Sequence, residues 1–531
     1  MRRDLHTECY PISTLPRLSR LFLDYAASRE PLAPFYAASP YAPVVATTHD
    51  SAQNAAIADF LEAQNRNYGA GEAALKNIAK MRAGAAAVVT GQQVTLFGGP
   101  LFTLLKAAAA IRRAKEAGAV PIFWMATEDH DLDEADHVTL PSRHELHTLR
   151  LEHSPEDAGK PVGSLRIGDS VLPLLEQASE LLGPGAALDA LQSAYTPRAT
   201  YAEAFGHFLA RVFTNEGLIL IDAAGREFHR LGSRVLRAAI ERAGEFEVLL
   251  LERARLLEER GYEAQVLVSE GGSLLFLIDD ETGARLPLKR KDDATWIAGR
   301  KQLSTEDLLA VLESEPERLS PNALLRPVFQ DSILPTAAYI GGPSEISYFA
   351  QSQVLYQAIL GRTTPVLPRL SATLVEPAAA KILAQHGLSL PDVMEAQPDE
   401  LARQLGARIL PEEGREKLDS AGTALDSELK ALTEWLARLD AGLGKSAEVA
   451  AGKMRYQMDR LKRLASEYQL QKESSLRKHV DTLYLNLFPD RHPQERIIGA
   501  AAFLARSGER LIGELVELAG AECPGHKAIF L

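Results

Sequence analysis

The densest group of chemically capable side chains lies in "TEDHDLDEADH", directly after the apolar run of residues 120–126. Such an uninterrupted run predicts a strand buried on both faces of a parallel sheet. Glu128, Asp129, His130 and Asp131 would then stand at the carboxyl end of a strand, where open α/β sheets bind ligands. They fit acid–base catalysis, binding of an ammonium group, or ligation of Zn or Mn. The alternative is a solvated acidic helix start.

A second group lies in "TGQQVTLFGGPLFTLLK", between a strand expected at 85–90 and a helix. Glycines permit a tight exit from the strand and close approach of the backbone to a ligand, and proline suits a first helical turn. Free amides at a helix start favour a phosphate or carboxylate. The expected binding residues are Thr90, Gly91, Gln92, Gln93, Gly98, Gly99 and Lys106. The alternative is an ordinary strand–helix connection whose glycines serve packing.

A further Gly-Gly-Pro turn occurs in "YIGGPSEISYF", also after an apolar run. Two such turns at the strand tips of one sheet would face one pocket. The candidate binding residues of this turn are Tyr339, Gly341, Gly342, Glu345 and Tyr348. Downstream, the Pro-marked segment "PVLPRLSA" would form a mobile loop whose Arg369 and Ser371 contact phosphate. "GLGKS" (442–446) lacks the first glycine of a phosphate loop and is interpreted as a turn between helices.

The order of elements predicts an α/β fold with a Rossmann-like sheet that insertions interrupt. We expect a helical segment at 1–84 and the core at 85–380, with insertions near 140–200 and 235–325. "ELHTLRLEH" and "VGSLRI" in the first insertion predict short strands, and "GSLLFLIDDETGARLPLKRKDD" predicts a hairpin that turns at "DETG". Residues 381–510 would form a helical coiled-coil domain, and 511–531 would return to the core.

Leucines with 3–4 spacing continue on both sides of "DAGLGKS" from about residue 414. This pattern predicts an antiparallel helical hairpin with coiled-coil packing, with one long bent helix as the alternative. Either form offers an apolar seam. The seam would join two copies of the chain in a homodimer or pack only against itself.

Composition narrows the class of protein. The 531 residues carry a formal net charge of −13, which argues against nucleic acid as the main partner. Two cysteines, Cys9 and Cys523, cannot build a disulfide framework or a Cys-rich zinc site and suggest a reduced cytoplasmic protein. The N-terminus lacks the pattern of a signal peptide, and no apolar run approaches the roughly 20 residues of a membrane span.

The chain resembles the BshC family, the cysteine ligases of bacillithiol biosynthesis. The matching segments are "VVTGQQ", "GGPL", "VPIFWMATEDHDLDEADH", "AAYIGGPSEISYF", "PVLPRLSATLVEP" and "LFPDRHPQER". The resemblance implies a Rossmann core like that of class I aminoacyl-tRNA synthetases, two connecting-peptide insertions, and a coiled coil used in dimerisation. It also implies that L-cysteine is joined to the amine of glucosaminyl-malate. Amide synthesis in water needs an activated carboxylate, for which ATP is the expected source.

The chain departs from the synthetase pattern at two places. "FGGPL" stands where a synthetase has His-Ile-Gly-His, and "PRLSA" is present in place of Lys-Met-Ser-Lys-Ser. With no cysteine cluster for zinc, no metal is firmly predicted. In the expected mechanism, His130, oriented by Asp129 or Asp131, takes a proton from the attacking amine, and the first turn with Lys106 steadies the oxyanion. The alternatives are a sugar- or nucleotide-transferase on the same fold, or a coiled-coil scaffold that needs only residues 414–500.

Overall fold

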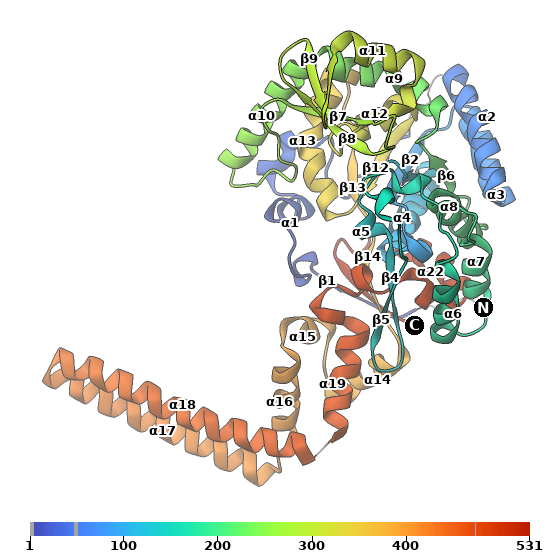
Figure 1. Cartoon of the computed structure of the whole chain (residues 1–531). Helices are drawn as coiled ribbons and strands as arrows, with labels where there is room; N and C mark the ends of the chain where they lie inside the picture. The colour runs from blue at the N-terminus through green and yellow to red at the C-terminus, as the bar shows by residue number, and fades with distance from the viewer. Residues whose placement is uncertain (1–4, 47–50, 473) are drawn as a thin grey trace. The chain divides into compact units, whose positions relative to one another are not determined.

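The computed structural model describes residues 5–46, 51–472 and 474–531 (Figure 1). The chain divides into two compact units. One contains Leu374–His492 and Phe530–Leu531, and the other contains His6–Thr373 and Pro493–Ile529. Among the described helices, none is both long enough and apolar enough to span a membrane.

A parallel sheet of five strands organises the larger unit, in the order β13-β12-β2-β3-β6 (Figure 1). The strands are β2 (Ala87–Gln93), β3 (Val120–Ala126), β6 (Ile219–Asp222), β12 (Thr336–Gly341) and β13 (Val366–Pro368). From β2 the chain proceeds to β3 and β6, and then returns to the other side of β2 at β12. This change of direction between β2 and β12 marks where an open α/β sheet binds ligands. The Rossmann-like prediction is confirmed.

Helices connect the strands and cover the sheet. Small alanines at 107–110 of α4 (Phe102–Ala117) let this helix pack closely on β2 and β3. Pro343 begins α13 (Pro343–Leu360), where the Glu345 carboxylate accepts from the Gly342 amide, and the helix leads from β12 to β13. The expected N-terminal helices are α1 (Arg20–Ala26), α2 (Ser51–Asn67) and α3 (Glu72–Arg82). Of these, α2 and α3 pack against the edge strand β6.

The first insertion, between β3 and β6, contains a short helix, a hairpin and three longer helices. These elements are α5 (Leu132–Ala135), β4 (His137–Pro141), β5 (Leu146–Arg150), α6 (Val171–Leu182), α7 (Ala186–Ala194) and α8 (Tyr201–Val212). The strand expected in "VGSLRI" is wrong, because Val162–Ser164 form a 3-10 helix. The amides of Val162 and Gly163 donate to the carbonyls of Asp129 and Thr127, so this segment holds the loop after β3.

The second insertion, between β6 and β12, contains two long helices and an antiparallel sheet in the order β10-β9-β8-β7-β11. Its elements are α9 (Arg226–Glu241), α10 (Ala243–Glu259), β7 (Gly272–Ile278), β8 (Arg285–Arg290), β9 (Thr295–Ala298), β10 (Lys301–Ser304), α11 (Thr305–Ser314), β11 (Leu319–Pro321) and α12 (Arg326–Ile333). The expected hairpin is confirmed as β7 and β8.

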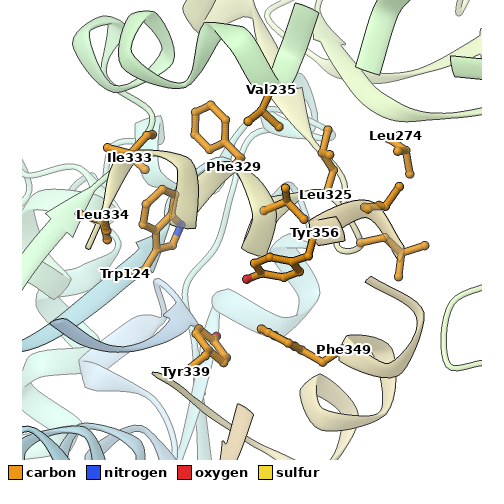
Figure 2. Close-up of a cluster of buried hydrophobic side chains, with 14 of the residues drawn as sticks. Trp124, Val235, Leu274, Leu325, Phe329, Ile333, Leu334, Tyr339, Phe349 and Tyr356 are labelled. Carbon is orange, nitrogen blue, oxygen red and sulfur yellow. The ribbon is translucent and has the colours of Figure 1, made fainter. Parts of the chain in front are cut away.

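The inserted sheet and the Rossmann-like sheet share one hydrophobic core. Figure 2 shows part of it, with Trp124 of β3, Val235 of α9, Leu274 of β7 and Phe329 of α12 in the same buried cluster. The rings of Trp124 and Phe329 meet edge to face with centroids 6.3 Å apart. The insertion is therefore packed firmly enough to present side chains to the tips of the parallel strands.

The smaller unit is helical. Its helices are α14 (Pro377–His386), α15 (Leu390–Glu395), α16 (Pro398–Arg408), α17 (Glu412–Leu439), α18 (Ala441–Lys472) and α19 (Ser474–Leu487). Figure 1 shows α17 and α18 side by side. Ion pairs from Arg455 to Asp426 (2.7 Å) and from Lys462 to Asp419 (3.0 Å) show that they run antiparallel. The helical hairpin is confirmed, and "GLGKS" lies in the first turns of α18.

The two ends of the larger unit meet. Residues 493–529 contribute α20 (Gln494–Ile497), α21 (Ala500–Ser507), α22 (Arg510–Leu518) and most of β15 (His526–Phe530). Strand β1 (Thr7–Tyr10) pairs antiparallel with β15. This pairing brings Cys9 beside Cys523, and the two form a disulfide. The expectation of two reduced thiols is wrong, because residues distant in sequence become neighbours here.

Asn65 of α2 hydrogen-bonds the backbone of β6 at the edge that has no neighbouring strand. Its buried amide donates to the carbonyl of Leu220 (2.8 Å) and accepts from the amide of Leu220 (2.9 Å). Asn65→Ala leaves both backbone groups unpaired and should lower the free energy of unfolding by about 2 kcal/mol in urea denaturation. The control Asn67→Ala changes an exposed residue of the same helix and should cost less than about 0.5 kcal/mol. Equal losses in both variants would contradict this role.

Candidate active site

A cavity of about 840 Å³ opens at the carboxyl ends of β2, β3 and β12. The inserted sheet closes one side through Phe276, Arg285 and Pro321, and Arg496 of α20 borders it. The predicted residues that line it are Gly91, Gln92, Gln93, Lys106, Glu128, Asp129, His130, Tyr339, Gly342, Glu345, Tyr348 and Arg369. The structure thus brings residues of the acidic segment and of both Gly-Gly-Pro segments together at one edge of the sheet, as the sequence predicted.

Lys106 of α4 and Glu345 of α13 form an ion pair that is largely withdrawn from solvent. The Lys106 ammonium also donates to the Gly91 carbonyl (2.8 Å) and to the Gln92 side chain (2.9 Å). The Glu345 carboxylate accepts from the Tyr339 hydroxyl (2.6 Å) and from the Gly342 amide (2.7 Å). Every strong hydrogen-bonding position of the ammonium is occupied, so Lys106 fixes the floor of the cavity instead of offering a free cation to a phosphate.

The turn expected to bind phosphate does not fit a phosphate. The Gly98 amide donates to the Tyr195 hydroxyl, the Gly99 amide to the Leu96 carbonyl, and the Leu101 amide to the Ile498 carbonyl. Both glycines have positive φ, and a Cβ on Gly98 would lie 2.2 Å from the Phe208 ring. Their role is packing, which was the alternative weighed from the sequence.

Three other predicted residues differ from expectation. Strand β2 extends to Gln93, so Gly91 lies inside the strand, where a Cβ would meet the Trp124 carbonyl at 2.7 Å. Thr90 lies outside the cavity lining and donates to the Ile340 carbonyl. Gly341 also lies outside the lining, and its carbonyl accepts from the Arg369 amide.

His130 lies in the cavity lining, but neither predicted carboxylate hydrogen-bonds its ring, and the Asp129 carboxylate lies 3.9 Å from Nδ1. The Asp129 carboxylate accepts from the backbone amides of His130 and Asp131, and Asp131 caps α5 and lies outside the lining. Instead, the Arg285 guanidinium lies 3.2 Å from Nδ1 of His130. An arginine can only donate, so Nδ1 accepts and the proton of the neutral ring is on Nε2. Burial and Arg285 lower the pKa of His130, in keeping with a neutral ring.

Arg369 is not part of a mobile phosphate-contacting loop. Its buried guanidinium makes two hydrogen bonds to the buried carboxylate of Glu495, at 3.0 and 2.6 Å. Ser371 also reaches Glu495 and bonds His526 at 2.8 Å. Burial alone would raise the pKa of Glu495, but Arg369 outweighs it and lowers that pKa. The segment is therefore a structural tie between β13 and α20.

Sequence reasoning missed several charged residues of the cavity. Arg326 of α12 donates to the hydroxyls of Tyr348 (2.6 Å) and Tyr339 (3.4 Å). Arg285 stacks on the Phe276 ring with the guanidinium carbon 3.9 Å from its centroid. Arg496 is solvent-exposed and makes no ion pair within the described parts of the chain. In the sequence, Arg496 was marked only by its position in "LFPDRHPQER", one of the segments that match the BshC family.

Metal ligation finds no support in the geometry. Within the described residues, no group of three or more His, Cys, Asp and Glu side chains is arranged to hold a metal ion. The carboxylates of residues 128–136 separate instead: Asp131 caps a helix, and Asp136 pairs with Arg150 outside the cavity.

The Lys106–Glu345 pair should make stability depend on pH. Burial alone would raise the pKa of Glu345, but Lys106, Tyr339 and Gly342 together lower it below 4.5. This contribution is fully present above pH 4.5 and is lost as pH falls through the lowered pKa. Glu345→Gln leaves Lys106 buried without a counter-charge and should cost about 3 kcal/mol at pH 7 in urea denaturation.

The difference between wild type and Glu345→Gln should shrink as pH falls below 4.5, because the wild-type carboxylate then becomes protonated. A matched control is Glu227→Gln, since Glu227 is exposed and pairs with Arg230 at 3.4 Å. A pH-independent difference for Glu345→Gln, or an equal loss for Glu227→Gln, would refute the assignment.

Comparison with known proteins gives a consistent result. The model "Bacillithiol biosynthesis BshC, N-terminal Rossmann-like domain" matches residues 5–370, and the model of the BshC C-terminal coiled-coil domain matches residues 372–531. The chain is 42% identical to BshC of Koribacter versatilis over 536 residues, covering 98% of this chain and 99% of the relative. It is 33% identical to BshC of Solibacter usitatus, covering 99% and 100%, and 33% identical to BshC of Chlorobaculum tepidum, covering 87% and 86%. The names of these relatives propose a cysteine ligase activity. The chain therefore belongs to the BshC family of bacillithiol biosynthesis.

Proposed function

We propose that this chain joins the carboxyl group of L-cysteine to the amine of glucosaminyl-malate, forming an amide bond and giving bacillithiol. The observation that carries the proposal is the charge distribution of the cavity. Glu128 and Asp129 lie at the tip of β3, while Arg496, which is exposed and makes no ion pair with the described residues, borders the same cavity. Glucosaminyl-malate carries an amine at one end and two carboxylates at the other, so it matches a cavity with both signs of charge.

Arg496 is the residue that best fits the malate carboxylates. The other arginines and the lysine of the lining are committed to protein partners: Lys106 to Glu345, Arg369 to Glu495, Arg326 to two tyrosine hydroxyls, and Arg285 to Ser320, the Pro321 carbonyl and His130. A guanidinium without such a partner can bind a carboxylate through two parallel hydrogen bonds. This leaves the acidic tip of β3 for the amine-bearing end of the substrate.

His130 fits a hydrogen-bond donor better than the general base that the sequence suggested. Arg285 occupies Nδ1, so the proton on Nε2 is available for donation to the acyl oxygen as negative charge develops there. Accepting a proton at Nε2 would first require Arg285 to release the ring. We therefore assign His130 to stabilising the acyl oxygen, with Arg285 as the group that sets its tautomer.

Activation of the cysteine carboxylate by ATP remains an expectation. When bound, ATP would supply a leaving group by adenylation of that carboxylate. The amides of the Gly98–Gly99 turn and the Lys106 ammonium are already paired, so they do not fit a triphosphate. We derive no step through the nucleotide at this turn.

Thiol profiling by mass spectrometry tests the proposal. The gene is placed in a bacillithiol-producing bacterium that lacks its own cysteine-adding enzyme. The expected result is the return of bacillithiol with a fall in glucosaminyl-malate. The His130→Phe variant, which lacks the Nε2 donor, should form at least about 90% less bacillithiol than the wild type. Persistent glucosaminyl-malate despite abundant folded protein would contradict the function.

Arg496→Ala should raise KM for glucosaminyl-malate about tenfold or more, because a charged hydrogen-bonded partner of the carboxylates is removed. KM for L-cysteine should change less than about threefold. The control Arg510→Ala removes an exposed arginine at the start of α22 and should change neither value. Equal increases in both KM values for Arg496→Ala would contradict the assignment to malate.

We also propose that two copies of the chain associate through the helical hairpin. The apolar side chains of α17 and α18 are not all used within the hairpin. Leu432, Trp435 and Leu439 lie on one face of α17 and are 52%, 50% and 59% exposed, and Leu464 of α18 is 53% exposed. A face of this kind on a long antiparallel hairpin is typical of an interface between subunits.

Trp435→Glu places a charge in this face and should convert a dimer into a monomer of 57.8 kDa. Analytical ultracentrifugation measures the mass directly. The control Lys430→Glu introduces a negative charge at an exposed site of the same helix. A monomeric wild type, or a dimeric Trp435→Glu variant, would show that the hairpin packs only against itself.

A further inference from the structure

A buried histidine, His229, contacts the cavity carboxylate of Glu128 on the side away from the cavity. The Glu128 side chain is 13% exposed and lines the cavity, whereas the imidazole of His229 is fully buried and lies outside the lining. The Nε2 atom of His229 lies 2.7 Å from a carboxylate oxygen of Glu128. His229 belongs to the first turns of α9, which follows β6, the neighbour of β3 in the sheet.

The ring of His229 is fixed on its other side as well. Its Nδ1 lies 3.2 Å from the Gly225 carbonyl, and its face packs on the Phe329 ring with centroids 5.5 Å apart. Phe329 is part of the core drawn in Figure 2 and packs against Gly232 so closely that a Cβ there would lie 2.1 Å away. The imidazole therefore has one available position.

Hydrogen-bond roles determine the protons. A carbonyl only accepts, so Nδ1 of His229 carries a proton. The contact of Nε2 with Glu128 is an ion pair whose geometry is not that of a regular hydrogen bond, and a second proton on Nε2 makes it attractive, because an unprotonated Nε2 would turn a lone pair toward the carboxylate. Burial alone would lower the pKa of His229, but Glu128 and the Gly225 carbonyl outweigh burial and raise it. The raised pKa favours an imidazolium facing the carboxylate.

We infer that His229 is a positioning residue that holds the Glu128 carboxylate aimed into the cavity, where Glu128 receives the primary ammonium group of a substrate. This inference rests on the proposed function, because both L-cysteine and glucosaminyl-malate carry an amine. His229 itself has no access to the cavity and acts through Glu128. The neighbouring Asp129 adds negative charge to the same side of the cavity.

Titration calorimetry with four ligands tests the inference. The amine ligands are L-cysteine and glucosaminyl-malate, and their matched partners without an amine are 3-mercaptopropionate and glucosyl-malate. Glu128→Gln and His229→Leu should weaken one amine ligand about tenfold or more and leave its partner within about twofold. The ligand affected identifies which substrate amine Glu128 receives.

His229→Gln supplies the conservative variant, because its side-chain amide can donate to Glu128 without titrating. It should keep the affinity within about threefold of wild type. The double variant Glu128→Gln/His229→Leu should bind no more weakly than Glu128→Gln alone, since His229 acts through Glu128. His207→Leu is the control, because His207 is a partly buried histidine that bonds the Tyr68 carbonyl away from the cavity.

The pH dependence separates positioning from simple packing. As pH rises through the raised pKa of His229, Nε2 loses its proton and turns a lone pair toward the carboxylate, so amine affinity should fall. His229→Gln should lack this part of the fall. The other ionisable groups that face the pair are Asp222 at the end of β6, Asp129, Arg285 of β8 and Glu317. They are unchanged in the comparison.

Three results would overturn the inference: unchanged amine affinity in folded His229→Leu, equal weakening of the ligands without an amine, or the same pH profile in wild type and His229→Gln. Should His229→Leu fail to fold, Glu128→Gln and the pH profile of His229→Gln decide the matter. Failure of the proposed function looks different, because neither amine ligand would then bind the wild-type protein.

Discussion

The buried pair of Lys106 and Glu345 is the interaction on which the arrangement of the site depends. It crosses the point where the sheet reverses its strand order and ties β2 to the turn after β12. Lys106 is buried and the Glu345 side chain is only 16% exposed, so each charge depends on the other. The Gly91 carbonyl and the Gly342 amide complete the set of partners. With these strand tips fixed, the floor of the cavity is rigid before any ligand arrives.

Around this floor, the fold separates charges that are neutralised by the protein from charges left for a ligand. Arg369 is neutralised by Glu495, and Glu128 is held by His229 on the side away from the cavity. Arg496 is left exposed, and the second oxygen of Glu128 is not needed by His229. The proposed reaction, between two substrates that each bear an amine and at least one carboxylate, needs this kind of separation, because misplaced counter-charges would compete with the substrates.

Local signals in the sequence predicted the framework. The apolar run of β3 and the Gly-Gly-Pro turn after β12 placed two strand tips correctly, since both depend on neighbouring residues. Other features depend on contacts between distant residues. Tyr195, 97 positions after Gly98, takes the amide expected for phosphate, and Arg285, 155 positions after His130, sets the ring that Asp129 or Asp131 was expected to orient. No spacing in the sequence records such pairings.

The central claim is that one cavity receives glucosaminyl-malate with its amine at the tip of β3 and its carboxylates at Arg496. A crystal structure of the wild-type protein with saturating glucosaminyl-malate measures this most directly. The account predicts the sugar amine within hydrogen-bond distance of Glu128 or Asp129 and a malate carboxylate on Arg496. Density for the ligand at another site, or malate turned away from Arg496, would contradict it.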